Sequence, residues 1–293
     1  MKSNPDIRPF TVGNISVTAF CDFSEPQSVK GFFPQMTPKQ RELLDRYYDW
    51  YHSDDMIPAW EYNSYLIKDG DRTILWDTGV GNSKITHLTY EPKWEGKLPC
   101  MLAEEGVALT DIDIILCSHF HPDHNGWNVI KTETGYSKTF PNAHYIGPKE
   151  DFDAYPTGIF GDSIPEESYQ ANMVFLSENG DMTWFEEPVM KITNHITVYH
   201  SPGHVPGLHY LIIESEGECA ILTSDNFASP IHISAPDTVY LYDQEIENVI
   251  EGRRQILDIC RDKKIHYLGA AHFGPGTLET DDDGTLFWVP LGI

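Results

Sequence analysis

Four short apolar runs in this chain are each followed, within four residues, by a histidine or an aspartate, and this pattern constrains the fold more than any other feature. The runs, each with the residue that follows it, are 112–117 with His119, 196–200 with His204, 219–223 with Asp225 and 265–270 with His272. Apolar runs of this length, bounded by turn residues, predict buried strands. If these strands share one sheet and point the same way, their carboxyl ends converge at one edge, where α/β proteins place ligand sites. We therefore expect the four polar side chains to meet.

The segment after the first run concentrates potential metal ligands, namely His119, His121, Asp123 and His124. Neutral imidazole nitrogens and carboxylate oxygens are ligands that Zn²⁺ and similar ions take. Two residues apart in extended backbone, His119 and His121 point the same way, and Pro122 biases His121 towards that conformation. Asp123 and His124 leave the following turn and can face a second ion.

The overall charge excludes several classes of partner. Lys and Arg total 20 against 45 Asp and Glu, which gives a formal charge of −25. Such a chain repels phosphate backbones and offers no basic patch to anionic lipid, so we expect neither nucleic-acid nor membrane binding. No run approaches the roughly 20 apolar residues of a membrane helix.

The five cysteines contain no CxxC pair, which favours reduced thiols over a disulfide framework. The first residues lack the apolar segment of a secretory signal. We expect a cytoplasmic protein, unless a signal has been removed.

Strand-like and helix-like segments alternate, which predicts a layered α/β protein. The expected strands are 14–20, 62–68, 72–76, 112–117, 143–147, 196–200, 208–213, 219–223 and 265–270. A helix over about 244–262 has an apolar stripe and Asp243 as its candidate cap. A second helix over about 38–51 starts with a capping-box pattern, Thr37 with Gln40, and a proline at its first position. Without internal repeats or linkers, we expect one domain over 1–293, with an aromatic-rich N-terminal insertion at about 24–62.

The ordered set of the HxHxDH motif at 119–124, the Pro-Gly-His that ends in His204, Asp225 and His272 resembles the metallo-β-lactamase superfamily. The resemblance covers roughly residues 10–275. It implies a four-layer αββα sandwich with metal ions at the edge of two packed sheets.

The resemblance also implies a ligand set for two divalent metal ions, with zinc favoured over iron or manganese. The first ion is held by His119, His121 and His204, the second by Asp123, His124 and His272, and Asp225 bridges them. Asp77 matches a position at which the family often has a carboxylate that orients metal-bound imidazoles; a plain turn is the alternative. The other histidines match no ligand position.

The residues also favour one activity group within the superfamily. Asp225 at the bridging position and His124 disfavour a β-lactamase, the charge disfavours nucleic-acid processing, and the short acidic C-terminus lacks a basic glutathione site. The segments 77–81, 124–127 and 140–143 look like the N-acyl-homoserine lactonase and methyl parathion hydrolase group. One departure is that Ala228 stands where those lactonases have a tyrosine that touches the substrate carbonyl.

The expected function is a binuclear metal-dependent hydrolase of the lactonase or esterase type. A hydroxide that bridges two ions would attack a lactone or ester carbonyl, and Asp225 would relay a proton to the leaving group. Asp123 is the second expected catalytic residue. The alternatives are a phosphotriesterase, a thioester hydrolase similar to hydroxyacylglutathione hydrolases, and a metal-binding sensor or structural protein. Structural zinc sites are usually closed by four protein ligands, so a shared set of seven ligands favours catalysis.

The aromatic residues of 31–62 exceed what one short helix needs for packing. We expect Phe33, Trp60, Trp127 and Phe227 to form an apolar wall for a neutral, hydrophobic small-molecule substrate. The alternative is that these aromatics pack the helix onto the sandwich or form a subunit interface, which leaves a homodimer open.

Overall fold

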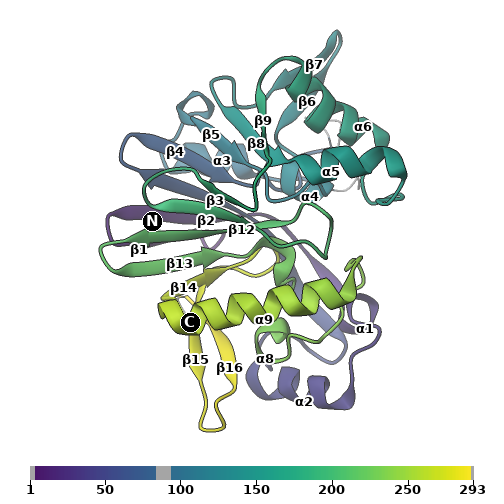
Figure 1. The fold of residues 1–293 in the computed structure, drawn as a ribbon, viewed down its shortest axis with the longest axis vertical. Helices are drawn as coiled ribbons and strands as arrows, with labels where there is room; N and C mark the ends of the chain where they lie inside the picture. The colour runs from purple at the N-terminus through teal and green to yellow at the C-terminus, as the bar shows by residue number, and fades with distance from the viewer. Residues whose placement is uncertain (1–3, 84–93, 292–293) are drawn as a thin grey trace.

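The computed structural model describes residues 4–83 and 94–291, which contain two mixed sheets of seven strands (Figure 1). The first sheet has the order β1 (Ile7–Val12), β2 (Ile15–Ser28), β3 (Met56–Asp69), β4 (Arg72–Trp76), β5 (Ile114–Leu116), β8 (His144–Pro148), β9 (Met182–Phe185). The second has the order β10 (Val189–Lys191), β11 (Ile196–His200), β12 (His209–Ser215), β13 (Glu218–Leu222), β14 (Tyr267–Gly269), β15 (Gly276–Thr280), β16 (Leu286–Pro290). A separate hairpin joins β6 (Val129–Thr132) to β7 (Gly135–Lys138).

Helical segments cover the outer faces of the two sheets. The α-helices are α1 (Val29–Phe32), α2 (Pro38–Tyr47), α3 (Leu98–Glu104), α4 (Pro122–Asn125), α5 (Lys149–Ala154), α6 (Glu166–Tyr169), α7 (Leu176–Glu178), α8 (Ile231–Ser234) and α9 (Ile246–Lys263). In Figure 1, α5 and α6 lie on the side of β8 and β9, whereas α9 crosses the side of β13 and β14. Within the described residues, none of these helices is both long and apolar enough to cross a lipid bilayer.

The two-residue period of the strands explains the layers. In β4, Leu75 faces the apolar cluster under the helices of the first sheet, whereas Ile74 and Trp76 face the cluster between the sheets. In β13, Ile221 faces the cluster under α9, whereas Leu222 faces the first sheet. Because successive side chains point to opposite faces, each central strand feeds two apolar interfaces. The expected four-layer αββα sandwich is confirmed.

Most of the expected elements lie where the sequence predicts them, with shifted ends. The capping box of α2 forms as predicted, with mutual bonds between Thr37 and Gln40, but the helix ends at Tyr47. The long helix α9 starts after Glu245, which makes no side-chain cap. The prediction that Asp243 caps this helix is therefore wrong, because its carboxylate is bound elsewhere.

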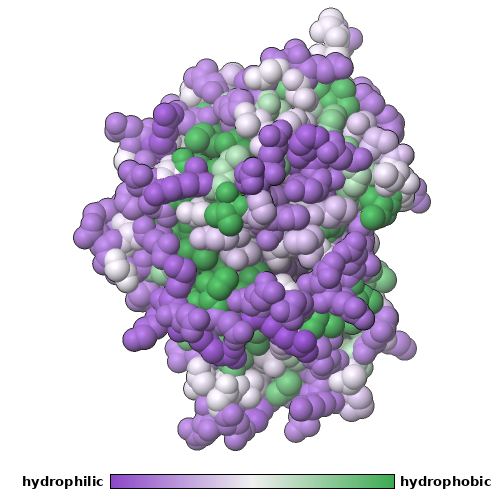
Figure 2. All heavy atoms as spheres, in the orientation of Figure 1, coloured by the Kyte–Doolittle hydropathy of each residue, from purple (hydrophilic) through white to green (hydrophobic). Residues whose placement is uncertain are grey.

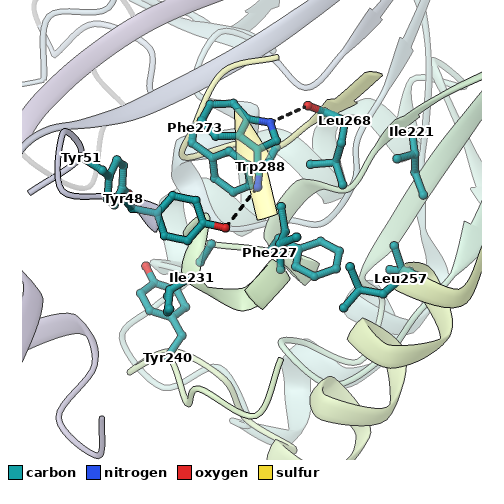
Figure 3. Packing of buried hydrophobic residues seen from close by; sticks show 14 of the residues in the cluster. Tyr48, Tyr51, Ile221, Phe227, Ile231, Tyr240, Leu257, Leu268, Phe273 and Trp288 are labelled. Atoms are coloured by element: carbon teal, nitrogen blue, oxygen red, sulfur yellow. Dashed lines mark hydrogen bonds between the residues drawn. The ribbon is translucent and has the colours of Figure 1, made fainter. Parts of the chain in front are cut away.

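Residues 29–55 leave the first sheet between β2 and β3 and contain α1 and α2. They pack against the second sheet. The hydroxyl of Tyr48 accepts a hydrogen bond from Trp288 N at 3.2 Å, and Trp288 Nε1 donates to Leu268 O at 3.3 Å (Figure 3). The helical part of the expected insertion thus contacts the sandwich through buried aromatic side chains.

The surface is largely hydrophilic on the face shown in Figure 2, in line with the excess of acidic residues. The carboxylate of Asp22, however, is fully buried. Asp22 accepts hydrogen bonds from Val80 N, Lys97 N and Leu98 N at 2.6–2.9 Å and from Trp127 Nε1. It joins three loops at the end of the first sheet. Burial raises the pKa of Asp22 to about 6, although these donors oppose the increase.

We expect Asp22→Ala to lower the free energy of unfolding by about 3 kcal/mol or more, because it leaves several buried N–H donors without an acceptor. Urea denaturation measures this loss. The control is Asp6→Ala, which removes an exposed ion pair with Lys97 and should change stability by less than about 1 kcal/mol. Equal losses in the two variants would contradict the role of Asp22.

Candidate metal centre

The loops at the carboxyl ends of the central strands bring all seven predicted ligands to one place. Within the described residues, potential metal ligands form two groups, in each of which the ligand atoms lie within 4.8 Å of one another. The first group is His119, His121, His204 and Asp225, and the second is Asp123, His124 and His272. They follow β5, β11, β13 and β14, as the pattern of apolar runs predicts.

Three imidazole nitrogens of the first group are buried and face one another. His121 Nδ1 lies 3.0 Å from His119 Nε2 and 3.1 Å from His204 Nε2. Burial lowers the pKa of His119 well below its usual range and that of His121 to about 3, and the neighbouring imidazoles add to both effects. Nδ1 of a neutral His121 carries either one hydrogen or one lone pair, so it forms a full hydrogen bond with only one of its two neighbours. A cation that binds all three nitrogens removes this mismatch.

The second group faces the first through Asp225. Asp225 Oδ2 lies 3.3 Å from both His204 Nε2 and His272 Nε2, and Asp225 Oδ1 lies 3.4 Å from His124 Nε2. Asp123 Oδ2 lies 3.4 Å from His124 Nε2. One carboxylate therefore reaches both groups, which is the placement that a bridging ligand needs.

Unpaired buried atoms support the fit to metal ions. Within the described residues, His124 Nε2 and Asp225 Oδ1 are buried and have no hydrogen-bond partner. Buried polar atoms are normally paired, so these atoms require a further partner. Burial alone would raise the pKa of Asp123, but His124 and His272 hold it at about 2, and they also hold the pKa of Asp225 well below its usual range. Deprotonated carboxylates beside imidazoles are the donor set of a divalent metal ion, and the two groups fit two such ions.

Carboxylates outside the two groups orient the imidazoles. Asp77 Oδ2 lies 2.9 Å from His124 Nδ1 and accepts from Ser118 Oγ at 2.7 Å, as expected of a carboxylate that fixes a metal-bound ring. Asp77 adopts a positive φ of 58°, a strained conformation that this pairing maintains. Asp243 Oδ1 lies 3.3 Å from His204 Nδ1. Sequence analysis missed this contact, because no local signal links residues that far apart.

A buried carboxylate also joins the two loops of the first group. Asp151, in α5, accepts from Phe120 N at 3.1 Å and from Gly207 N at 2.7 Å. Phe120 lies between two predicted ligands, and Gly207 closely follows His204. Asp151 therefore fixes the distance between loops that belong to different sheets.

A cavity of about 330 Å³ opens onto the two groups. Its wall is aromatic and is formed by Phe32, Trp60, Tyr62, Trp94, Tyr240 and Tyr242. The Trp60 ring stacks on His272 with centroids 4.7 Å apart, and Tyr240 lies parallel to His204 at 6.0 Å. These side chains place an apolar wall directly beside the predicted ligands.

The structure places only Trp60 of the four predicted substrate contacts on this wall. Phe33 is buried behind Trp60 and Tyr240. Trp127 is turned away from the cavity because its Nε1 donates to Asp22, and Phe227 is fully buried in the core under α9.

The tyrosines on the wall were not predicted as site residues. Ala228, the position at which the resembled lactonases have a tyrosine, is fully buried. Three tyrosines from other segments line the cavity instead, namely Tyr62, Tyr240 and Tyr242.

A family model of the metallo-beta-lactamase superfamily matches residues 57–272. The chain belongs to this superfamily. Among curated relatives, an N-acyl homoserine lactonase of Bacillus sp. is 25% identical over 201 residues, which cover 62% of this chain and 71% of the relative. The AiiA lactonase of Bacillus thuringiensis subsp. kurstaki is 23% identical over 222 residues, 69% of this chain and 80% of the relative.

Solved structures share the fold of this superfamily member. AidC, described as a dizinc quorum-quenching lactonase with a bound product, superposes with a TM-score of 0.78 at 22% identity, over 98% of each chain. The hydrolase AbOPH has a TM-score of 0.80 at 19% identity, over 100% of this chain and 99% of its own. Membership and the metal-binding groups together identify the chain as a metal-dependent hydrolase.

We expect protein purified without a chelator to contain two equivalents of divalent metal, measured by elemental analysis. Chelation should lower the thermal transition, because ions that bind only the native state stabilise it. His272→Ala should lose about one equivalent, whereas His195→Ala, which removes a pair with Asp69 outside both groups, should lose none. One equivalent in the wild type, unchanged in His272→Ala, would contradict two sites.

Proposed function

We propose that this hydrolase opens a lactone or cleaves a carboxylic ester of a neutral, hydrophobic small molecule. The observation that carries the proposal is the aromatic cavity that opens onto the two ligand groups, both of which Asp225 reaches. The names of the curated relatives, N-acyl homoserine lactonases, support a lactone as the substrate class.

The seven ligands would hold two ions, with zinc favoured over iron and manganese. Two divalent ions acidify a water that they share and polarise a carbonyl oxygen. Asp225 holds both groups at a fixed spacing, and its carboxylate can carry a proton from the nucleophile to the leaving oxygen. Asp123 belongs to the second group and lines the cavity, so its carboxylate can orient the nucleophile from that side.

The cavity wall supports a substrate without negative charge. Among the described residues that line it, none is lysine or arginine, and Glu25 adds a carboxylate that is not a predicted ligand. Tyr62 Oη donates to Glu25 Oε1 at 3.1 Å and Gln27 Nε2 donates to the same oxygen at 3.2 Å. The acidic side chains on this wall favour a neutral substrate over an anionic glutathione thioester. A neutral phosphotriester fits the same wall and is the second candidate.

A panel of metal-loaded assays tests the proposal. It compares lactones, aryl esters, phosphotriesters and a glutathione thioester. We expect the largest kcat/KM for a neutral lactone or ester. Asp225→Asn should retain the fold and lower kcat by more than about tenfold. A greater kcat/KM for phosphotriesters would select the second candidate. No turnover of any substrate by protein with two bound ions would favour a sensor or structural role.

Trp60→Ala should lower kcat/KM by an amount that grows with the apolar size of the substrate, by roughly 1–3 kcal/mol for a well-buried group. A series of acyl or aryl esters measures this dependence. Trp50→Ala is the matched control, since Trp50 is an exposed tryptophan that does not line the cavity. An equal loss for small and large substrates would show that Trp60 serves the fold alone.

Glu25→Gln should raise kcat/KM for an anionic ester relative to its neutral analogue, because it removes a like charge from the wall. The measured quantity is the ratio of the two kcat/KM values, which cancels effects common to both substrates. Glu42→Gln, in an exposed position on α2, provides the control. An unchanged ratio at low salt would exclude Glu25 from substrate selection.

One domain over 1–293 with its insertion at 24–62, a cytoplasmic location and a homodimer stay predictions.

A further inference from the structure

Arg253 is a fully buried cation outside the ligand groups. It projects from α9, and its guanidinium donates to three separate segments. Its Nε donates to Asn226 O at 2.6 Å, its Nη1 to Thr238 O at 2.7 Å and its Nη2 to Asp243 Oδ2 at 2.9 Å. Burial of a charge costs several kcal/mol, and the ion pair often only offsets that cost. Its contacts therefore indicate a role in organising what surrounds it.

Asp243 connects this guanidinium to the metal centre. Its Oδ1 lies 3.3 Å from His204 Nδ1, and its Oδ2 also accepts from Tyr240 N at 3.1 Å. The Arg253 guanidinium pairs with this carboxylate at 2.9 Å from the opposite side, so an anion faces the His204 ring. A buried anion next to Nδ1 favours the tautomer that carries its proton there. This tautomer leaves His204 Nε2 free to bind a metal ion.

We propose that Arg253 and Asp243 form a positioning pair that holds His204 with Nδ1 protonated and Nε2 directed at the first ligand group, and so sets the metal affinity of that group. Neither residue belongs to a ligand group. The proposal concerns metal binding and does not depend on which ester or lactone is hydrolysed.

The same guanidinium also holds a second ligand of that group. Asn226, whose carbonyl accepts from Arg253, follows Asp225 directly in the chain. Asn226 Oδ1 accepts from Ser201 Oγ at 2.6 Å, which ties this turn to the loop that carries His204. One side chain of α9 thereby fixes two ligands from different loops relative to each other.

The second group has a separate support. Asp77 contacts His124 Nδ1 and receives hydrogen bonds from Ser118 N and Oγ, both at 2.7 Å. The two groups are thus oriented by different carboxylates, only one of which is paired with Arg253. Loss of the Arg253–Asp243 pair should weaken one metal site and spare the other, a selectivity that general destabilisation would not produce.

Cobalt binding provides the test. Metal-free wild type, Asp243→Asn and Arg253→Lys are titrated with Co²⁺, followed by visible absorption, and with Zn²⁺ against a chelator. His204→Ala and His272→Ala assign each binding step to a group. We expect Asp243→Asn to weaken the step of the first group by about 10- to 100-fold and to leave the other step within about threefold. Arg253→Lys should weaken the first step at least as much and also affect the second, because Arg253 holds the turn that carries Asp225. Asp77→Asn should weaken the step of the second group most, with a smaller effect on the first group, because Ser118 Oγ, which donates to Asp77, also lies 3.1 Å from His119 Nδ1.

The neighbouring Arg254, exposed on α9, supplies the matched control, and Arg254→Lys should bind both ions as the wild type does. The proposal is overturned if Asp243→Asn is folded by circular dichroism and either binds both ions as tightly as the wild type or binds both more weakly by the same factor.

If the pair variants fail to fold, the wild type decides. In zinc-loaded protein with ¹⁵N-labelled histidine, His204 must show an Nδ1–H proton protected from solvent exchange and close to Tyr240. Protonation at Nε2, or an Nδ1–H that exchanges as in an exposed histidine, would equally overturn the proposal.

Discussion

The burial of ligands that repel one another is the constraint on which this structure depends. Nitrogens of His119, His121 and His204 meet at 3.0–3.1 Å inside the protein, and carboxylates lie beside them. Such a cluster opposes folding until a cation joins it, so the surrounding structure must hold it in place. Asp151 ties two ligand loops together, and Asp22 ties three loops at the end of the first sheet. Buried carboxyl groups that accept hydrogen bonds from backbone N–H groups thus support the buried ligands.

The strand ends and the ligands could be predicted from the sequence because both depend on local properties. Apolar runs mark buried strands, and imidazole or carboxylate at their ends marks ligand chemistry. Asp243 shows where this reasoning fails. By local rules it is a helix cap, but Arg253, ten residues later, binds its carboxylate on one side and His204 lies on the other. Only the packing of α9 against the ligand loops brings these groups together.

The aromatic excess of residues 31–62 shows a second limit. Trp60 and Tyr62 lie two residues apart in β3, so both point to one face and both contact His272. The expected strand starts at residue 62, but β3 starts at Met56, so the sequence could not place Trp60 on that face. Tyr48 and Phe33 instead pack behind the wall. The cavity and the core each take part of the aromatic set, and no local periodicity divides them.

For the proposed function, the residues that line the cavity matter more to the charge of the substrate than the total of −25 does. Salt screens exposed charges beyond about 8 Å at physiological ionic strength, so most surface acids have little effect inside the cavity. Bound divalent ions would offset the charges of Asp123 and Asp225. Glu25 is then the carboxylate among the described lining residues that is not a predicted ligand, and aromatic side chains surround it. The proposed preference for a neutral substrate therefore rests on the residues that line the cavity and not on the net charge of the chain.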